Sequence, residues 1–247
     1  MIQIRLTPAM GKRLIGKGMV VHPAIKTVLA EGTLAIIAGS TNGYVAEEIL
    51  GSLGYADAFD RIGFRRGLTV PLGAAAPAMD FPGDVVIRKG EWLKGRSIDD
   101  IVEELGDGDV VLKGGNAFDS RRQPAVQIGG IAGGTALIAV SSVIGRRVQL
   151  IVPISLEKRV FGDVYDLAML CNAAGGQGPR LFPLPGAIFT EIEAIKLLTG
   201  ADATMIAGGG VYGAEGSVWL VLSGSEEQVE SAAKLVNALA DEPLCEA

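Results

Sequence analysis

A glycine-rich stretch with small polar side chains is the first part of this chain that could do chemistry. It reads Gly39-Ser40-Thr41-Asn42-Gly43, between a short apolar run and apolar residues at helical spacing. A buried strand that feeds a helix through such a turn leaves backbone N–H groups and hydroxyls free where the helix begins. Phosphates and carboxylates bind readily at that position. The hydroxyls could equally serve only as helix caps.

A second candidate site follows the apolar run at 109–113 and reads Lys113-Gly114-Gly115-Asn116. The lysine would add positive charge for an anion, and the glycines would let the backbone approach a ligand closely. The asparagine can bind hydroxyl or amide groups. These residue types favour a binding site for a polar, negatively charged small molecule.

Further candidates extend this set. Lys158 follows a third apolar run and would add another cation, and Gly129-Gly130 open a second glycine-rich entry into a helix. Asp119 and Glu157 are the candidate bases if the site moves protons. Neither glycine run has the spacing of a dinucleotide or Walker motif, so nucleotide binding through those motifs is not indicated.

The elements that must position these residues alternate between apolar strands and helices. Strands expected at 33–38, 109–113 and 149–154 are separated by helical patterns. This order predicts an α/β fold with a Rossmann-like parallel sheet flanked by helices. Because ligands in such sheets bind beyond the carboxyl ends of the strands, we expect the three following loops to converge on one hollow.

Two domains are expected. Residues 1–165 would form the α/β ligand-binding domain, and residues 166–247 a small α+β subdomain beside it, lid-like and completed by the N-terminal strand. Gly208–Gly210 is expected to be a mobile turn or bulge, with a flap over a ligand as the alternative. An Ala/Pro connector is expected at 74–82.

Composition excludes several classes of function. The 247 residues include 49% hydrophobic residues, enough for a sizeable core, and carry a net charge of −6. A general nucleic-acid binder would usually be basic. No apolar run reaches the roughly 20 residues of a membrane span, and the N-terminus lacks a signal-peptide pattern. The two cysteines, Cys171 and Cys245, are too few for a disulfide framework, so we expect a cytoplasmic protein.

Two basic features stay open at this stage. His22 is the only histidine, and a structural role is favoured over a site role because no Cys or second His can join it in a zinc site. We therefore expect no metal. Arg61, Arg65 and Arg66 could clamp a carboxylate or phosphate, or could belong to a solvated turn or a subunit contact.

The three strand ends together resemble the superfamily of ribose-5-phosphate isomerase, glucosamine-6-phosphate deaminase and the CoA transferases. Residues 32–50 are similar to the first strand, Gly-Ser-Thr loop and helix of that superfamily, and 109–135 to its second strand with the glycine run beyond it. Residues 150–160 resemble the strand that ends near a lysine, matched by Lys158. The resemblance covers roughly residues 10 to 160 and implies a sugar-phosphate-like ligand.

This chain departs from the isomerase pattern at its acids. Lys113 and Asn116 stand where that pattern has aspartates, while Asp119 keeps the third acid. The family lysine before the glycine run is missing. The catalytic glutamate would lie in the helix after the glycines, yet no Asp or Glu occurs between residues 120 and 156.

Three functions are therefore weighed. The first is a binding protein, or an enzyme of unknown reaction and unknown cofactor, for a small anionic ligand. The second is an aldose–ketose isomerase with a relocated base, and the third is a non-catalytic assembly subunit. A homo-oligomer is expected, and the fold alone cannot choose among the three functions.

Overall fold

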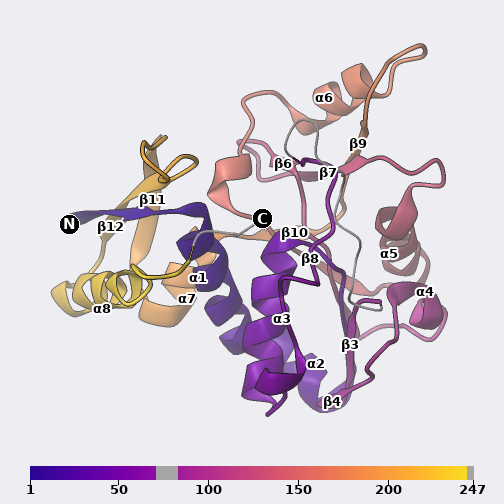
Figure 1. Cartoon of the computed structure of the whole chain (residues 1–247), viewed down its shortest axis with the longest axis horizontal. Coiled ribbons are helices and arrows are strands. Elements are labelled where there is room, and N and C mark those ends of the chain that lie inside the picture. Colours follow the sequence, from indigo (N-terminus) through magenta and orange to yellow (C-terminus); the bar gives the residue numbers. More distant parts are fainter. Residues whose placement is uncertain (71–82, 244–247) are drawn as a thin grey trace.

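A six-stranded mixed β-sheet forms the centre of the protein (Figure 1). The computed structural model describes residues 1–70 and 83–243, so the connector expected at 74–82 lies outside the described residues. In spatial order the strands are β10 (Ala187–Phe189), β8 (Gln149–Pro153), β5 (Val110–Leu112), β2 (Thr33–Ile36), β3 (Val85–Arg88) and β4 (Glu91–Trp92).

The sheet is mixed, which corrects the expected parallel sheet. Strands β10, β8, β5 and β2 are parallel, but β3 is antiparallel to β2 and β4 to β3. The reason lies in the chain after α3 (Ser40–Ser52), which returns to the carboxyl end of β2, where the Phe64 carbonyl accepts a hydrogen bond of 3.1 Å from the Gly39 amide. A strand that starts from that edge must run antiparallel to β2.

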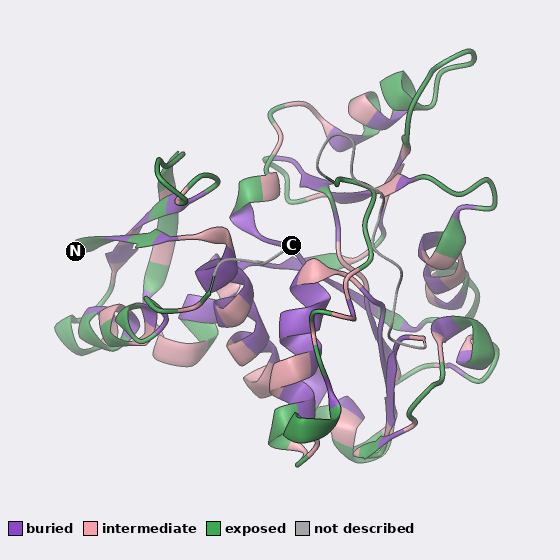
Figure 2. Cartoon of the chain, viewed as in Figure 1, coloured by how far each residue is buried: buried purple, intermediate pink, exposed green. Residues whose placement is uncertain are grey.

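Helices cover both faces of this sheet and bury its strands, as Figures 1 and 2 show. The helices α1 (Pro8–Val21), α2 (Pro23–Glu31) and α3 pack on one side, and α4 (Ile98–Ile101) and α5 (Gly134–Arg146) lie on the other. Every residue of β2 is buried, as a strand covered on two faces requires.

The first two helices are separate because of His22 and Pro23. Proline has no N–H and fixes the preceding residue in an extended conformation, so α1 ends at Val21 and α2 begins at Pro23. Helix α1 approaches α3 closely at Gly16, where a Cβ would lie 2.8 Å from the Tyr44 carbonyl oxygen. Glycine is therefore required for this contact between the two helices.

A smaller antiparallel sheet flanks the central one. It consists of β6 (Ala117–Phe118), β7 (Pro124–Ile128) and β9 (Arg180–Pro183), and α6 (Val164–Cys171) packs against β9. The short 3₁₀ turns are η1 (Ala56–Ala58) and η2 (Leu156–Lys158).

A third sheet contains the first and the last strand of the described chain. Strand β1 (Ile2–Leu6) pairs with β12 (Val218–Ser223), which pairs with β11 (Asp202–Gly208). Helices α7 (Glu191–Thr199) and α8 (Glu226–Asn237) pack beside it, at the left of Figure 1. The N-terminal strand thus completes this sheet.

Strand pairing crosses the domain boundary that was expected at residue 166. Strand β9 pairs with β7, and β10 pairs with β8, so the segment after residue 165 contributes strands to both sheets of the first part. A boundary at 166 therefore does not separate the sheets. Within the described residues, no helix is long and apolar enough to cross a membrane.

Candidate functional site

A cleft of about 870 Å³ lies where the central strands β2, β5 and β8 end. The loops after all three strands line it, so the convergence expected from strand order is present. Twelve of the residues predicted from sequence form part of its lining: Gly39, Ser40, Thr41, Asn42, Lys113, Gly114, Gly115, Asn116, Gly129, Gly130, Glu157 and Lys158. Two predicted residues, Gly43 and Asp119, do not.

The glycine-rich turn is in fact the first turn of α3, which begins at Ser40 and not after Gly43. The Gly43 amide donates to the Gly39 carbonyl over 2.8 Å, and the residue packs against Arg61. Gly43 therefore offers no amide to a ligand, contrary to the sequence prediction. The amides of Ser40, Thr41 and Asn42 are the ones that a helix start leaves without intrahelical partners.

Asn42 joins the ends of two strands. Its buried side-chain amide donates to the carbonyls of Ile37 at 2.8 Å and Leu112 at 3.0 Å. Within the described part of the chain, Asn42 Oδ1 and Thr41 Oγ1 are buried without a hydrogen-bond partner. The asparagine thus holds β2 and β5 together, and Thr41, which also belongs to the cleft lining, has a buried hydroxyl.

Among the charged side chains of the described lining, basic residues outnumber acidic ones. Four basic residues take part, namely Arg66, Lys113, Lys158 and Arg159, whereas Glu157 is the single acid among the described lining residues. The lining therefore carries a local excess of positive charge, although the chain as a whole has a net charge of −6.

Burial makes both lysines less basic. It lowers the pKa of Lys113 to about 8, against the attraction of Asp84 and with help from the charges of Arg66 and Lys158. Burial also lowers the pKa of Lys158, and nearby Lys12 adds to that effect. Their contacts with protein are modest, since Lys113 Nζ lies 3.5 Å from the Gly114 carbonyl oxygen and Lys158 Nζ 3.2 Å from that of Gly115.

The short turn η2 positions Glu157 in the cleft lining. Its carboxylate lies 3.5 Å from Lys12 Nζ of α1, and its side chain is 22% exposed. Next to it, the fully buried Glu191 accepts hydrogen bonds from Ser155 Oγ at 2.6 Å and the Leu156 amide at 3.0 Å. Burial raises the pKa of Glu191. These contacts fix the loop that carries Glu157 and Lys158.

Asp84 is a structural residue of the site that the sequence analysis missed. Its fully buried carboxylate accepts hydrogen bonds from the amides of Ala38 at 2.9 Å and Ile98 at 3.0 Å. Arg66 Nη1 lies 3.9 Å from the same carboxylate. The sequence signal for this role was an acid directly before an apolar strand. An acid in that position is buried with the strand, and a buried carboxylate needs several hydrogen-bond donors.

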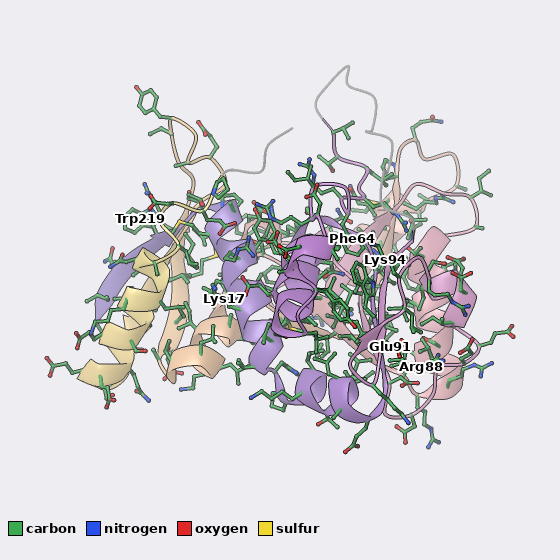
Figure 3. The ribbon with its side chains drawn as sticks, turned by 60° about the horizontal axis from the view of Figure 1, so that its bottom comes forward. Lys17, Phe64, Arg88, Glu91, Lys94 and Trp219 are labelled. Atoms are coloured by element: carbon green, nitrogen blue, oxygen red, sulfur yellow. The ribbon has the colours of Figure 1, made fainter. Side chains whose placement is uncertain are left out.

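The three arginines of the 61–66 segment have different roles. Arg61 lies over the Tyr44 ring at 4.4 Å and pairs with Glu47 at 3.3 Å, away from the cleft lining. Arg65 donates to a backbone carbonyl. Only Arg66 lines the cleft. Arg66 comes two residues after Phe64, which is labelled in Figure 3. The buried ring of Phe64 packs edge-on against the ring of Phe59, with the ring centroids 5.3 Å apart.

Asp119 holds a turn and does not reach the cleft. Its buried carboxylate accepts hydrogen bonds from the amides of Arg121 at 2.8 Å, Gln123 at 3.0 Å and Val164 at 3.1 Å. Burial alone would raise its pKa, but these bonds and the Arg121 charge hold the pKa below its ordinary value. Its proposed role as a relocated base is therefore corrected, and Glu157 is the remaining candidate.

His22 also lies outside the cleft lining. Its ring packs edge-on against Phe189 at 5.5 Å, and burial lowers its pKa. In the described ranges, no group of three or more His, Cys, Asp or Glu side chains could hold a metal ion.

Comparison with known proteins identifies no relative of this chain. No protein-family model matches the chain, and neither a curated protein nor a solved structure is significantly similar to it.

Proposed function

We propose that this protein binds a small anionic ligand of sugar-phosphate type in the cleft at the strand ends. The observation that carries the proposal is the charge of the lining, with four basic side chains against one acid. The backbone amides at the start of α3 would bind the anionic group, because a helix N-terminus favours negative charge. Thr41 Oγ1, buried and unpartnered, is suited to the same group.

The remaining residues suit the polar body of such a ligand. Lys113 and Lys158 extend from different strand ends, and the exposed Asn116 can bind hydroxyls. The volume of about 870 Å³ lies within the range of small-molecule sites. The resemblance to the sugar-phosphate isomerase superfamily agrees with this ligand class and is itself part of the proposal.

Calorimetric titration with ribose 5-phosphate and with ribose tests the proposal. We expect binding of the phosphate ester only, weakening as salt is added. Lys158→Met should reduce the affinity by about tenfold or more, because a charged hydrogen bond contributes roughly 1.5–3 kcal/mol. Lys26→Met is the matched control, since Lys26 is exposed and outside the lining. Equal affinity for ribose, or equal loss in both variants, would contradict the proposal.

An isomerase reaction is the second candidate, favoured by Glu157 as the one described acid of the lining. A base that moves a proton between sugar carbons must lie within reach of the substrate. Solvent proton exchange into ribose 5-phosphate in heavy water measures this step directly. Exchange that disappears in Glu157→Gln would support the isomerase, and the absence of exchange by the wild type would remove it.

An assembly role is the third candidate. The outer side of α6 exposes apolar side chains, among them Tyr165, Met169 and Leu170, of the kind that subunit interfaces bury. Static light scattering tests the expected homo-oligomer. A monomer at all concentrations would exclude self-assembly as the function.

A further inference from the structure

Lys113 is half-buried in the cleft lining, and it differs from four other lysines in having no carboxylate partner among the described residues. Lys12, Lys17, Lys196 and Lys234 each pair with a carboxylate. Among the described residues, Lys113 Nζ has no ion pair within 4 Å, and its one hydrogen bond, to the Gly114 carbonyl, is long at 3.5 Å. The amine thus lies in the cleft and makes no strong interaction that stabilises the fold.

The charged groups around Lys113 compensate its charge only in part. Asp84 is the nearby acid, but two backbone amides and Arg66 already occupy its carboxylate. Arg66, from the loop after α3, and Lys158, from η2, add like charge near Lys113. Such desolvation next to cationic groups is how proteins make a lysine amine nucleophilic at neutral pH.

We propose that Lys113 is a nucleophile that forms an imine with the ligand, so that the ligand class is a small aldehyde or ketone that also carries an anionic group. The inference rests on the proposed function, because the cationic lining and the start of α3 would hold the anionic end while the carbonyl reaches Lys113.

The covalent step balances without any further reagent. The lone pair of the neutral Nζ attacks the carbonyl carbon, and the carbonyl π electrons move to oxygen, which takes a proton to become a hydroxyl. Nitrogen loses one proton, the hydroxyl is protonated and departs as water to give a C=N⁺–H iminium, and loss of the remaining N–H proton gives the neutral imine. The sum is amine plus carbonyl to imine plus water, and the reverse reaction releases the ligand.

The amine is available at neutral pH. A lysine whose pKa is about 8 has about one amine in eleven unprotonated at pH 7. An unperturbed lysine of pKa about 10.4 has roughly one in 2,500. Lower basicity reduces intrinsic reactivity, so we expect a selectivity of about tenfold or more over exposed lysines rather than the full ratio.

Pyridoxal 5′-phosphate and pyridoxal are the matched probes, because both carry an aldehyde and only the first carries a phosphate. The full chain is incubated at pH 7 with each probe, trapped with borohydride, digested and mapped by mass spectrometry. We expect pyridoxal 5′-phosphate to modify Lys113 at least about tenfold faster than the exposed Lys26. Inorganic phosphate should slow this reaction, and pyridoxal should react more slowly at Lys113.

The outcomes separate the two proposals. Ribose 5-phosphate binding without selective trapping of Lys113 would overturn the imine and leave the anion site standing. Selective trapping that is equal with pyridoxal and insensitive to phosphate would support the nucleophile but contradict the anion site on which the inference rests. Trapping at Lys113 no faster than at Lys26, with no ribose 5-phosphate binding, would overturn both.

Two variants guard against misfolding and against nonspecific labelling. Lys113→Arg keeps the charge but cannot form an imine, so the labelled peptide should disappear while a cooperative thermal unfolding transition shows that the variant is folded. Arg66→Gln removes one of the like charges, so the midpoint of the pH profile of Lys113 trapping should move to higher pH. An unchanged midpoint would contradict the arrangement of charges proposed around the amine.

Discussion

Asp84 supports the cleft from beneath, so replacing it with asparagine tests how the site is held. Its two carboxylate oxygens accept from different amides, Ala38 at 2.9 Å and Ile98 at 3.0 Å. An asparagine has one oxygen, so whichever way its amide points, one buried N–H would face an NH₂ group. An unsatisfied buried donor costs about 1–3 kcal/mol.

The lost ion pair adds a smaller amount. Arg66 is 35% exposed and lies 3.9 Å from Asp84, so this pair contributes at most about 1 kcal/mol. Asp84→Asn should therefore lower the free energy of unfolding by about 1–4 kcal/mol, or the melting temperature by roughly 2–16 °C. Because Asp84 holds the pKa of Lys113 up, the variant should also lower that pKa below about 8.

Urea and thermal unfolding of Asp84→Asn measure the stability, and the pH profile of Lys113 trapping measures the pKa. Asp99→Asn is the matched control on the exposed side of α4, where surface substitutions usually change stability by about 0.5 kcal/mol or less. If the two variants had the same stability, or if the trapping midpoint moved to higher pH, the role assigned to Asp84 would be wrong.

Three further predictions concern other features. The pKa of Lys113 is lower folded than unfolded, so stability should rise with pH between about 8 and 10.5. The difference in unfolding free energy between wild type and Lys113→Met should accordingly grow by about 2 kcal/mol from pH 7 to 9.5, and a constant difference would refute the shift. The raised pKa of Glu191 has the opposite effect on the pH dependence of stability. The free energy of unfolding should fall as pH rises above 4.5, and Glu191→Gln should flatten this dependence in urea titrations. Gly16→Ala should destabilise by about 1–3 kcal/mol at the Tyr44 carbonyl, whereas Gly51→Ala, with nothing within 4 Å, should stabilise by about 0.5–1 kcal/mol; the same sign in both would contradict the packing of α1 on α3.

The convergence of the strand-end loops could be predicted because it follows from local patterns. Short apolar runs that end in glycine and polar residues mark buried strands, and parallel strands place their ends on one edge. This logic located Ser40, Asn116 and Lys158 on a common cleft. It did not depend on knowing which helix covers which face.

Other features depend on long-range contacts that no local pattern reveals. The reversed direction of β3 follows from where the chain lies after Phe64, and the role of Asp84 follows from two amides far from it in sequence. Asp119 illustrates the converse error. An acid beside a glycine-rich strand end is typical of a catalytic site. The carboxylate of Asp119 instead accepts hydrogen bonds from backbone amides of the turn that follows it.

The central claim is that the three loops form one anion site, and amide chemical shifts test it most directly. In a ¹H–¹⁵N spectrum titrated with ribose 5-phosphate, we expect the amide signals of Ser40, Gly115 and Lys158 to move together with one dissociation constant. Signals that stay still, or that move in one loop alone, would contradict it.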